Sequence, residues 1–144
     1  MDTVCTWKEK VLFDASFGQH SVPMDTKAPI GTDRAASPKE LVLAAICGCS
    51  GMDVVSLLRK AKQLPTTFSI EAHADITTGH PAIFSQVRLL YKLQGPIEAE
   101  VIKDAVNKSM TLYCSVSAMI SKACPISYEI ECNGSKIATG EAKF

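Results

Sequence analysis

The sequence predicts an α+β domain built around one long, apolar helix. A helix-capping signal at residues 37–40 precedes an extended apolar stretch, and residues 97–110 have apolar side chains at helical spacing. Residues 67–76 and 87–93 alternate between apolar and polar side chains, which is typical of half-buried strands. With 144 residues and 47% apolar composition the chain can bury one core, so we expect a single domain over residues 1–144.

The N-terminal segment predicts a β-hairpin or meander followed by a loop. Residues 4–17 contain the apolar and aromatic side chains typical of short strands, with a charged turn near residues 8–10. Residues 18–37 are dense in Gly, Pro, Asp and Ser. We expect that stretch to be a loop that connects two parts of one domain.

Residues 38 to about 62 predict the central helix. Ser37 is suited to the N-cap, Pro38 to the first helical position, and Glu40 completes a capping box. The basic residues near the other end suit the negative end of the helix dipole. The middle is apolar on most sides, with one polar line formed by Ser50, Asp53 and Ser56. We expect such a helix to be buried against several neighbours.

The two alternating segments that follow predict an antiparallel hairpin. Residues 67–76 and 87–93 flank a turn at residues 78–81, and Gly95 with Pro96 closes the second strand.

The C-terminal part predicts two helices and a second hairpin. Residues 97–110 predict an amphipathic surface helix, and residues 114–123 a short helix that Pro125 stops. Residues 126–132 alternate as a strand. Asn133 and Gly134 then form a hairpin signal before residues 136–144.

Charge and the N-terminal sequence bear on partners and on location. Fifteen basic and fifteen acidic residues give a net charge of zero, so we expect no nucleic-acid or membrane partner. The first residues lack the basic start and unbroken apolar run of a secretory signal, and we expect a cytoplasmic protein. Residues 41–58 contain Asp53 and several Ser and Gly, which favours a core helix over a membrane span. In the cytoplasm thiols are kept reduced, so the six cysteines do not predict a disulfide framework.

Cys47 and Cys49 invite interpretation as a metal-binding pair, but helical geometry opposes it. Side chains two positions apart on a helix point about 200° away from each other and cannot reach one ion. No CxxC motif supplies further ligands, and we expect His20, His73 and His80 to be surface residues. We therefore expect no metal and no cofactor. A serine or cysteine hydrolase is also disfavoured, because no GxSxG elbow is present.

Cys49 and Cys114 are the cysteines whose positions suit chemistry. Cys49 lies inside the central helix, which suits a thiol that reacts with a small substrate in an apolar pocket. Cys114 is expected in the first turn of its helix, where free backbone N–H groups favour a thiolate and a resolving role. For any single cysteine in this chain, a packing role remains the alternative.

Two segments resemble the OsmC/Ohr family of thiol-dependent peroxidases: SPKELVLAAICGCSGMDVVSLLRKAK, and YCSVSAMISKACPISYEI some sixty residues later. The pattern is most similar to the OsmC-like subgroup with a GCSxxDVV motif. The resemblance implies an OsmC-like fold, with antiparallel sheets packed around a long central buried helix. It also implies an intertwined homodimer with each active site at the subunit interface.

By position, the resemblance implies that Cys49 is the peroxidatic cysteine and Cys114 the second, resolving cysteine. Cys47 is then a small core residue, and Cys5, Cys124 and Cys132 match no catalytic position of the family. The implied activity is reduction of organic (alkyl or lipid) hydroperoxides in oxidative or osmotic stress defence, with an external dithiol as reductant. An apolar pocket would favour organic peroxides, since each buried methylene contributes about 0.8 kcal/mol.

The chain departs from the better-studied peroxidase subgroups in the groups that activate the thiolate. Those subgroups have a glutamate directly after the helix-opening proline, paired with an arginine from the N-terminal strands. Here that position is Lys39, and the first 30 residues contain no arginine. Asp53 lies one turn from Cys49 and opposes its ionisation unless Lys39, Arg34 or a partner-subunit residue supplies a cation. The alternative function is a non-catalytic or weakly catalytic dimer that binds an apolar small molecule or senses redox state.

Overall fold

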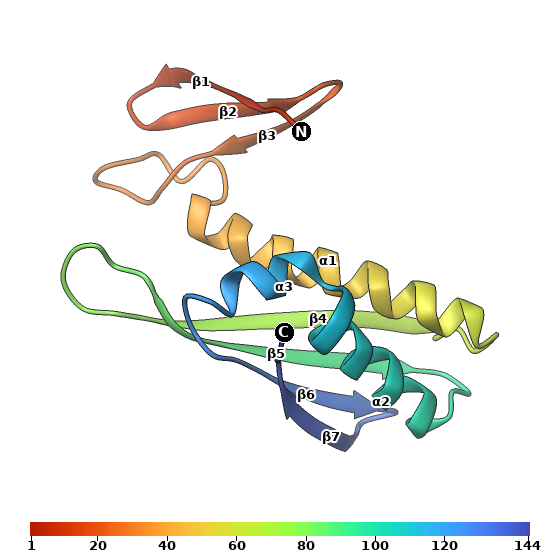
Figure 1. The fold of residues 1–144 in the computed structure, drawn as a ribbon. Helices are drawn as coiled ribbons and strands as arrows, with labels where there is room; N and C mark the ends of the chain where they lie inside the picture. The colour runs from red at the N-terminus through yellow and green to blue at the C-terminus, as the bar shows by residue number, and fades with distance from the viewer. The chain divides into compact units, whose positions relative to one another are not determined.

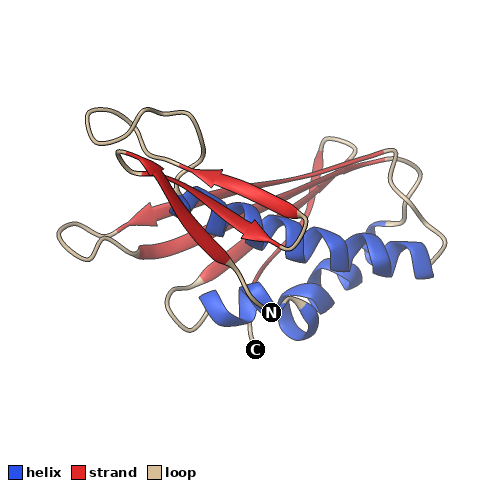
Figure 2. Cartoon of the chain, turned by 90° about the horizontal axis from the view of Figure 1, so that it is seen from above, coloured by secondary structure: helices blue, strands red, loops and turns tan.

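The computed structural model describes residues 1–144, and the chain divides into two compact units, residues 1–42 and 43–144. Helix α1 (Pro38–Lys60) begins in the first unit and continues through the second. The α+β class is confirmed by two sheets and several helices (Figures 1 and 2). The assignment of residues 1–144 to one domain stays a prediction.

The first unit contains a three-stranded antiparallel sheet in the order β1-β2-β3 (Figure 1). Its strands are β1 (Val4–Glu9), β2 (Leu12–Phe17) and β3 (His20–Met24). The predicted meander is confirmed, but the prediction of a loop from residue 18 was wrong for β3. Gly18 adopts a positive φ in the tight turn before β3, and Pro23 is tolerated because β3 is an edge strand.

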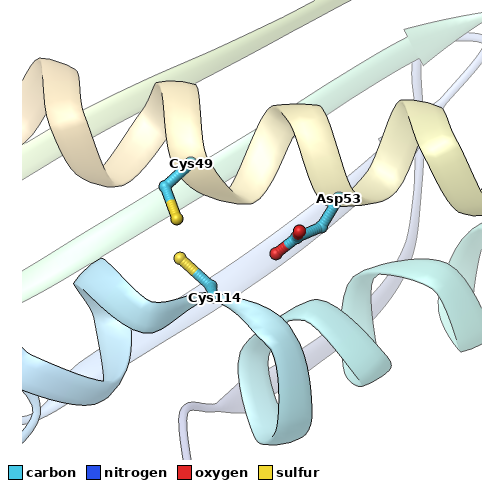
Figure 3. A group of neighbouring side chains, drawn as sticks. All are labelled: Cys49, Asp53 and Cys114. Atoms are coloured by element: carbon cyan, nitrogen blue, oxygen red, sulfur yellow. The ribbon is translucent and has the colours of Figure 1, made fainter.

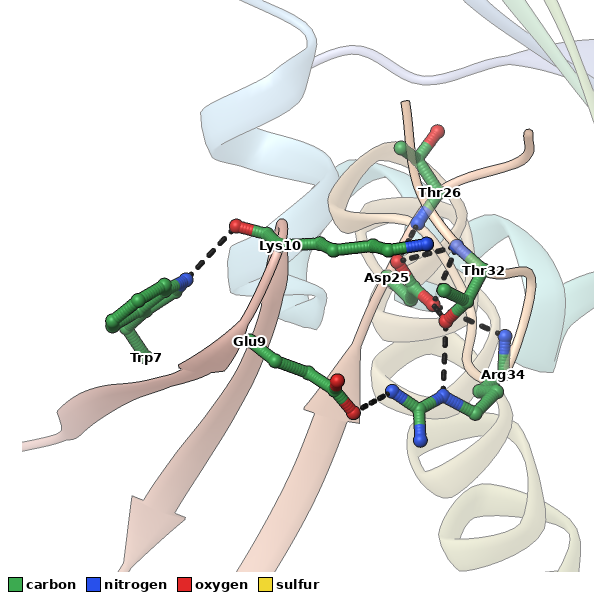
Figure 4. Close-up of polar contacts among 7 residues, drawn as sticks. All are labelled: Trp7, Glu9, Lys10, Asp25, Thr26, Thr32 and Arg34. Atoms are coloured by element: carbon green, nitrogen blue, oxygen red, sulfur yellow. Dashed lines mark hydrogen bonds and ion pairs between the residues drawn. The ribbon is translucent and has the colours of Figure 1, made fainter. Parts of the chain in front are cut away.

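The loop after β3 is organised around the buried carboxylate of Asp25 (Figure 4). Asp25 accepts hydrogen bonds from the backbone N–H groups of Thr26 (2.8 Å), Thr32 (3.1 Å) and Arg34 (3.2 Å). The Thr32 hydroxyl donates a further bond of 2.5 Å. The Thr32 hydroxyl and these backbone donors lower the pKa of Asp25 to about 2, although burial opposes them.

The start of α1 has the predicted capping box. The backbone N–H of Ser37 donates to the carboxylate of Glu40 at 2.7 Å, and the Glu40 N–H donates to the Ser37 hydroxyl at 3.4 Å. These Ser37 contacts lower the pKa of Glu40.

One face of α1 is buried in the single chain. The buried residues follow a spacing of four: Ile46, Ser50, Val54 and Leu58. The remaining faces are half-buried or exposed, and Met52 keeps 76% of its surface exposed. We expected α1 to be buried on several sides. Within a single chain, only one side of the helix is buried. Helix α1 is also the one helix that is long and apolar enough to cross a bilayer. Central helices of globular proteins meet the same criterion of length and hydropathy.

The second unit contains a four-stranded sheet in the order β4-β5-β6-β7, with the helices on one side of it (Figure 1). Its strands are β4 (Thr67–Ile76), β5 (Phe84–Gln94), β6 (Ile126–Cys132) and β7 (Ser135–Glu141). The two predicted hairpins are confirmed as the antiparallel pairs β4/β5 and β6/β7. The expected antiparallel pattern fails at β5/β6, which pair in parallel because a helical crossover returns the chain to the same end.

The crossover consists of α2 (Ala99–Lys108), the π-helical turn η1 (Ser109–Tyr113) and α3 (Ser115–Ile120). Helix α2 is amphipathic, as predicted, and buries Ile102, Ala105 and Val106. The core joins these side chains to the inward face of the sheet and to α1; its largest buried members include Tyr91, Leu89, Leu93, Ile126, Ile130, Val54 and Leu58.

Candidate functional site

Cys49 and Asp53 lie on successive turns of α1 and point toward the same space (Figure 3). Their spacing of four residues places both on one face of the helix. Both side chains are half-buried. The Cys49 Sγ lies 3.9 Å from the Ser115 hydroxyl at the start of α3.

Cys47 faces elsewhere, as the helical geometry predicts. It lines a groove of about 570 Å³ between α1 and β4, together with Gly51, Met52, Phe68 and Ile70. Burial raises the pKa of Cys47, so this thiol is protonated at neutral pH. The groove is largely apolar in its lining residues and does not include Cys49.

Cys114 is fully buried and caps helix α3. Its backbone is extended, between the π-turn and α3, and its own N–H closes that turn by donating to the Ser109 carbonyl at 2.9 Å. The thiol accepts a hydrogen bond from the Ser117 N–H at 3.4 Å. Cys114 is therefore the N-cap rather than a residue of the first turn, and its sulfur lies at the positive end of a short helix.

The π-turn brings Cys114 next to α1, where it meets Cys49 and Asp53 (Figure 3). The two Sγ atoms and a carboxylate oxygen of Asp53 all lie within 4.8 Å of one another. The two cysteines singled out from the sequence are thus brought together, although many residues separate them. We refer to Cys49, Asp53 and Cys114 as the thiol cluster.

The environment of Cys114 favours its protonated form. Burial raises the pKa of the Cys114 thiol, the Ser117 hydrogen bonds oppose this, and the neighbouring Cys49 sulfur adds to it. At neutral pH Cys114 is accordingly a thiol. Once it loses its proton, the Ser117 N–H is already in place to stabilise the thiolate.

A buried chain of hydroxyl groups ends on Asp53. The Ser109 hydroxyl donates to Asp53 Oδ2 at 3.0 Å, because an ionised carboxylate only accepts. The Ser109 hydroxyl also contacts that of Ser50 (3.3 Å), and Ser50 contacts the hydroxyl of Tyr91, which donates to the Met110 sulfur at 3.2 Å. Burial raises the pKa of Tyr91, so its hydroxyl remains a donor. No buried side-chain oxygen or nitrogen lacks a partner.

Most of the hydroxyl chain was not predicted from the sequence. Ser50 was noted only as part of the polar line on α1. Ser109 continues the inward series of α2 at a spacing of four from Ala105, and a polar residue at such a position is the available signal. Tyr91 lies in a segment predicted as an alternating strand and Met110 in one predicted as an amphipathic helix, and both side chains are buried.

Arg34 and Lys39 were proposed as cations that offset the charge of Asp53 beside Cys49, and their surroundings differ. Arg34 donates to the Glu9 carboxylate and to the Thr32 hydroxyl (2.9 Å) within the first unit (Figure 4), and Glu9 raises the pKa of Arg34. Lys39 is exposed. Within the second unit, Lys60 shares a cavity of about 150 Å³ with Asp53, which makes it a further cation near the thiol cluster.

The other residues considered from the sequence take no part in the thiol cluster. The three histidines are exposed, as expected. Cys5 is exposed, whereas Cys124 and Cys132 are buried in the core.

Comparison with known proteins identifies the family. The model of the family "OsmC-like protein" matches residues 31–129. The chain belongs to the OsmC-like family. It is 32% identical over 127 residues to the protein YhfA of Escherichia coli K12, covering 87% of this chain and 92% of YhfA.

Solved structures agree with the OsmC-like fold. A hypothetical protein from Aquifex aeolicus is 25% identical, with a TM-score of 0.78 over 92% of this chain and 96% of its own. An organic hydroperoxide resistance protein from Elizabethkingia anophelis is 16% identical, with a TM-score of 0.72 over 91% of this chain and 94% of its own. The fold and the OsmC/Ohr membership predicted from the sequence are confirmed.

Proposed function

We propose that this OsmC-like protein is a thiol-dependent peroxidase that reduces organic (alkyl or lipid) hydroperoxides in oxidative or osmotic stress defence. Cys49 is the peroxidatic cysteine and Cys114 the resolving cysteine. The observation that supports this best is the thiol cluster, in which both sulfurs lie within 4.8 Å of each other and of Asp53. The names of related structures, among them organic hydroperoxide resistance proteins, agree with a peroxide substrate.

The catalytic cycle has three steps. The Cys49 thiolate attacks the distal oxygen of the hydroperoxide and breaks the O–O bond; the leaving alkoxide takes a proton, giving an alcohol and a Cys49 sulfenic acid. Cys114 loses its proton and attacks the Cys49 sulfur, which releases water and forms a disulfide. An external dithiol then reduces the disulfide to two thiols and is itself oxidised.

The environments of the two thiols suit this order of events. The raised pKa of Cys114 keeps it protonated while Cys49 reacts, so the two sulfurs are not both ionised at close range. Asp53 places a carboxylate within 4.8 Å of the Cys49 sulfur. Lys60, or a cation contributed at a subunit interface, is proposed to offset that charge.

A homodimer with the active site at the subunit interface accounts for the apolar surface around the thiol cluster. Leu112 and Tyr113 precede Cys114 and Met119 follows it, and each of them is more than half exposed. Large apolar side chains gathered in this way mark interaction surfaces. Light scattering on the purified protein tests the dimer, which a monomer at micromolar concentration would contradict.

We further propose a cytoplasmic location, where dithiol reductants are available.

The activity is tested by steady-state consumption of cumene hydroperoxide with a dithiol reductant. Cys49→Ser is expected to abolish turnover. Cys114→Ser is expected to consume about one equivalent of peroxide and stop at a sulfenic acid that dimedone traps. Cys5→Ser, which replaces an exposed cysteine outside the thiol cluster, serves as the matched control and is expected to retain full activity. Absence of turnover with every dithiol and peroxide tried overturns the proposal.

A non-catalytic or weakly catalytic dimer is the second candidate function. It is favoured by one observation: Asp53 stands beside both thiols, and none of the ion pairs in the chain involves Asp53. Such a protein would bind an apolar small molecule or sense redox state slowly. A Cys49 thiol that is alkylated no faster than free cysteine, together with tight binding of an apolar ligand, would favour this function over catalysis.

A further inference from the structure

The distances between the sulfur and oxygen atoms of the thiol cluster suit coordination of a single metal ion. In a tetrahedral zinc site the ligand atoms lie about 2.0–2.3 Å from the metal, so neighbouring ligand atoms are about 3.5–3.8 Å apart. The three candidate atoms of the thiol cluster lie within 4.8 Å of one another, so each needs to move by about 1 Å or less. A disulfide requires the sulfurs to approach to about 2.05 Å, which is a larger displacement.

The donor set has a definite chemical preference. Two thiolates and one carboxylate select a thiophilic cation such as Zn²⁺ over Mg²⁺ or Ca²⁺, which prefer oxygen ligands. Three protein ligands also leave a fourth position for water. Asp53 makes no ion pair within the chain, so its carboxylate is available to a cation.

Hydrogen bonds already orient two of the three side chains that Figure 3 draws. Ser109 holds Asp53 Oδ2 at 3.0 Å and leaves the other carboxylate oxygen free. The Ser117 N–H contacts the Cys114 sulfur at 3.4 Å. Metal ligands are typically supported by such outer hydrogen bonds, which fix the direction of their lone pairs.

We infer that reduced Cys49, Cys114 and Asp53 form a site for a thiophilic divalent cation, with Zn²⁺ as the representative ion. Binding releases one proton from each thiol, and the bound ion slows attack of Cys49 on a peroxide. Oxidation of the two thiolates by a hydroperoxide and two protons gives the disulfide, an alcohol and water, and frees the cation. This site is distinct from a Cys47/Cys49 pair, which helical geometry excludes.

The inference rests on the same reduced thiols as the proposed function, and it is tested without peroxide. The metal-free, full-length protein is reduced with a phosphine and titrated with Co²⁺ under anaerobic conditions. We expect saturation at one equivalent per chain, with the thiolate-to-cobalt charge-transfer band and the visible bands of a tetrahedral site. Zn²⁺ is expected to displace the Co²⁺ and abolish both signals.

Variants identify the ligands. Cys49→Ser is expected to abolish the charge-transfer spectrum, and Asp53→Asn to weaken binding by at least tenfold. Cys47→Ser is the matched control, because it removes a thiol from another face of α1, and it is expected to bind like the wild type. Cys114→Ser removes a fully buried residue, so the oxidised wild-type protein supplies a second measurement and is expected to bind no Co²⁺.

The outcomes separate this inference from the proposed function. Stoichiometric binding that depends on Cys49 and Asp53 but not on Cys47 supports the metal site, whether or not peroxide is turned over. The metal site is overturned if the wild type binds no Co²⁺, or if Cys49→Ser or Asp53→Asn binds Co²⁺ as the wild type does. It is also overturned if Cys47→Ser loses Co²⁺ binding to the same extent as those variants. Those results leave the peroxidase proposal standing, because its turnover is measured in metal-free buffer.

Discussion

Ser109→Ala is predicted to destabilise the protein through the hydroxyl chain that ends on Asp53. Ser109 is fully buried and donates to Asp53 Oδ2 at 3.0 Å. A hydrogen bond to a charged group contributes about 1.5–3 kcal/mol to stability. Because Asp53 is half-buried, water can satisfy part of what is lost, and Ser50 keeps its contact with Tyr91. We therefore expect the free energy of unfolding to fall by roughly 2 kcal/mol.

Urea unfolding followed by far-ultraviolet circular dichroism, at one fixed protein concentration, measures this change. Ser56→Ala on α1 is the matched control: it removes the same hydroxyl from an exposed position and is expected to change the free energy of unfolding by less than about 0.5 kcal/mol. The stabilising role of the hydroxyl chain would be refuted by a Ser109→Ala variant that unfolds within about 0.5 kcal/mol of the wild type.

Three further predictions follow from the charges and pKa shifts. Asp53→Asn is expected to speed alkylation of Cys49 at neutral pH by about fivefold or more, because a charge within 4.8 Å costs about 1 kcal/mol even at the dielectric constant of water. In Cys49→Ser, alkylation of Cys114 is expected to rise at a higher pH than for free cysteine, because burial raises the Cys114 pKa. The folded-state pKa of Asp25 is lowered from 3.8 to about 2, so its contribution to stability is complete above pH 3.8 and is lost as the pH falls through about 2. Amide hydrogen exchange of residues 26–34 is expected to show that loss.

Each of these predictions has a result that contradicts it. Unchanged alkylation of Cys49 in Asp53→Asn would mean that the carboxylate does not influence the thiol. An alkylation profile of Cys114 that coincides with free cysteine would contradict its burial. Exchange in residues 26–34 that does not change between pH 3.8 and 2 would contradict the role of Asp25 in holding its loop.

The sequence predicted correctly those helix ends and strands that depend on interactions between neighbouring residues. The capping box at Ser37 and Glu40 and the alternating strands were correct because neighbouring residues alone decide them. Strand β3 was missed because its segment is rich in loop-forming residues, and pairing with β2 stabilises it from outside the segment. The parallel pairing of β5 with β6 depends on the crossover, which no local pattern encodes.

In the candidate site, too, local features could be predicted from the sequence and tertiary features could not. Helical geometry separated Cys47 from Cys49, but the pairing of Cys49 with Cys114 came from family resemblance. Their proximity depends on the π-turn and on the packing of the crossover against α1, and both are tertiary features. Ser109 was missed because sequence periodicity shows where a side chain faces and not which partner it finds.

The measurement that tests the central proposal most directly is mass spectrometry of the reduced, metal-free protein after one equivalent of cumene hydroperoxide. The thiol cluster predicts a disulfide joining the peptides that contain Cys49 and Cys114, formed in step with loss of the peroxide and absent from Cys49→Ser. Protein whose Cys49 and Cys114 both remain free thiols while the peroxide persists would contradict the proposed chemistry.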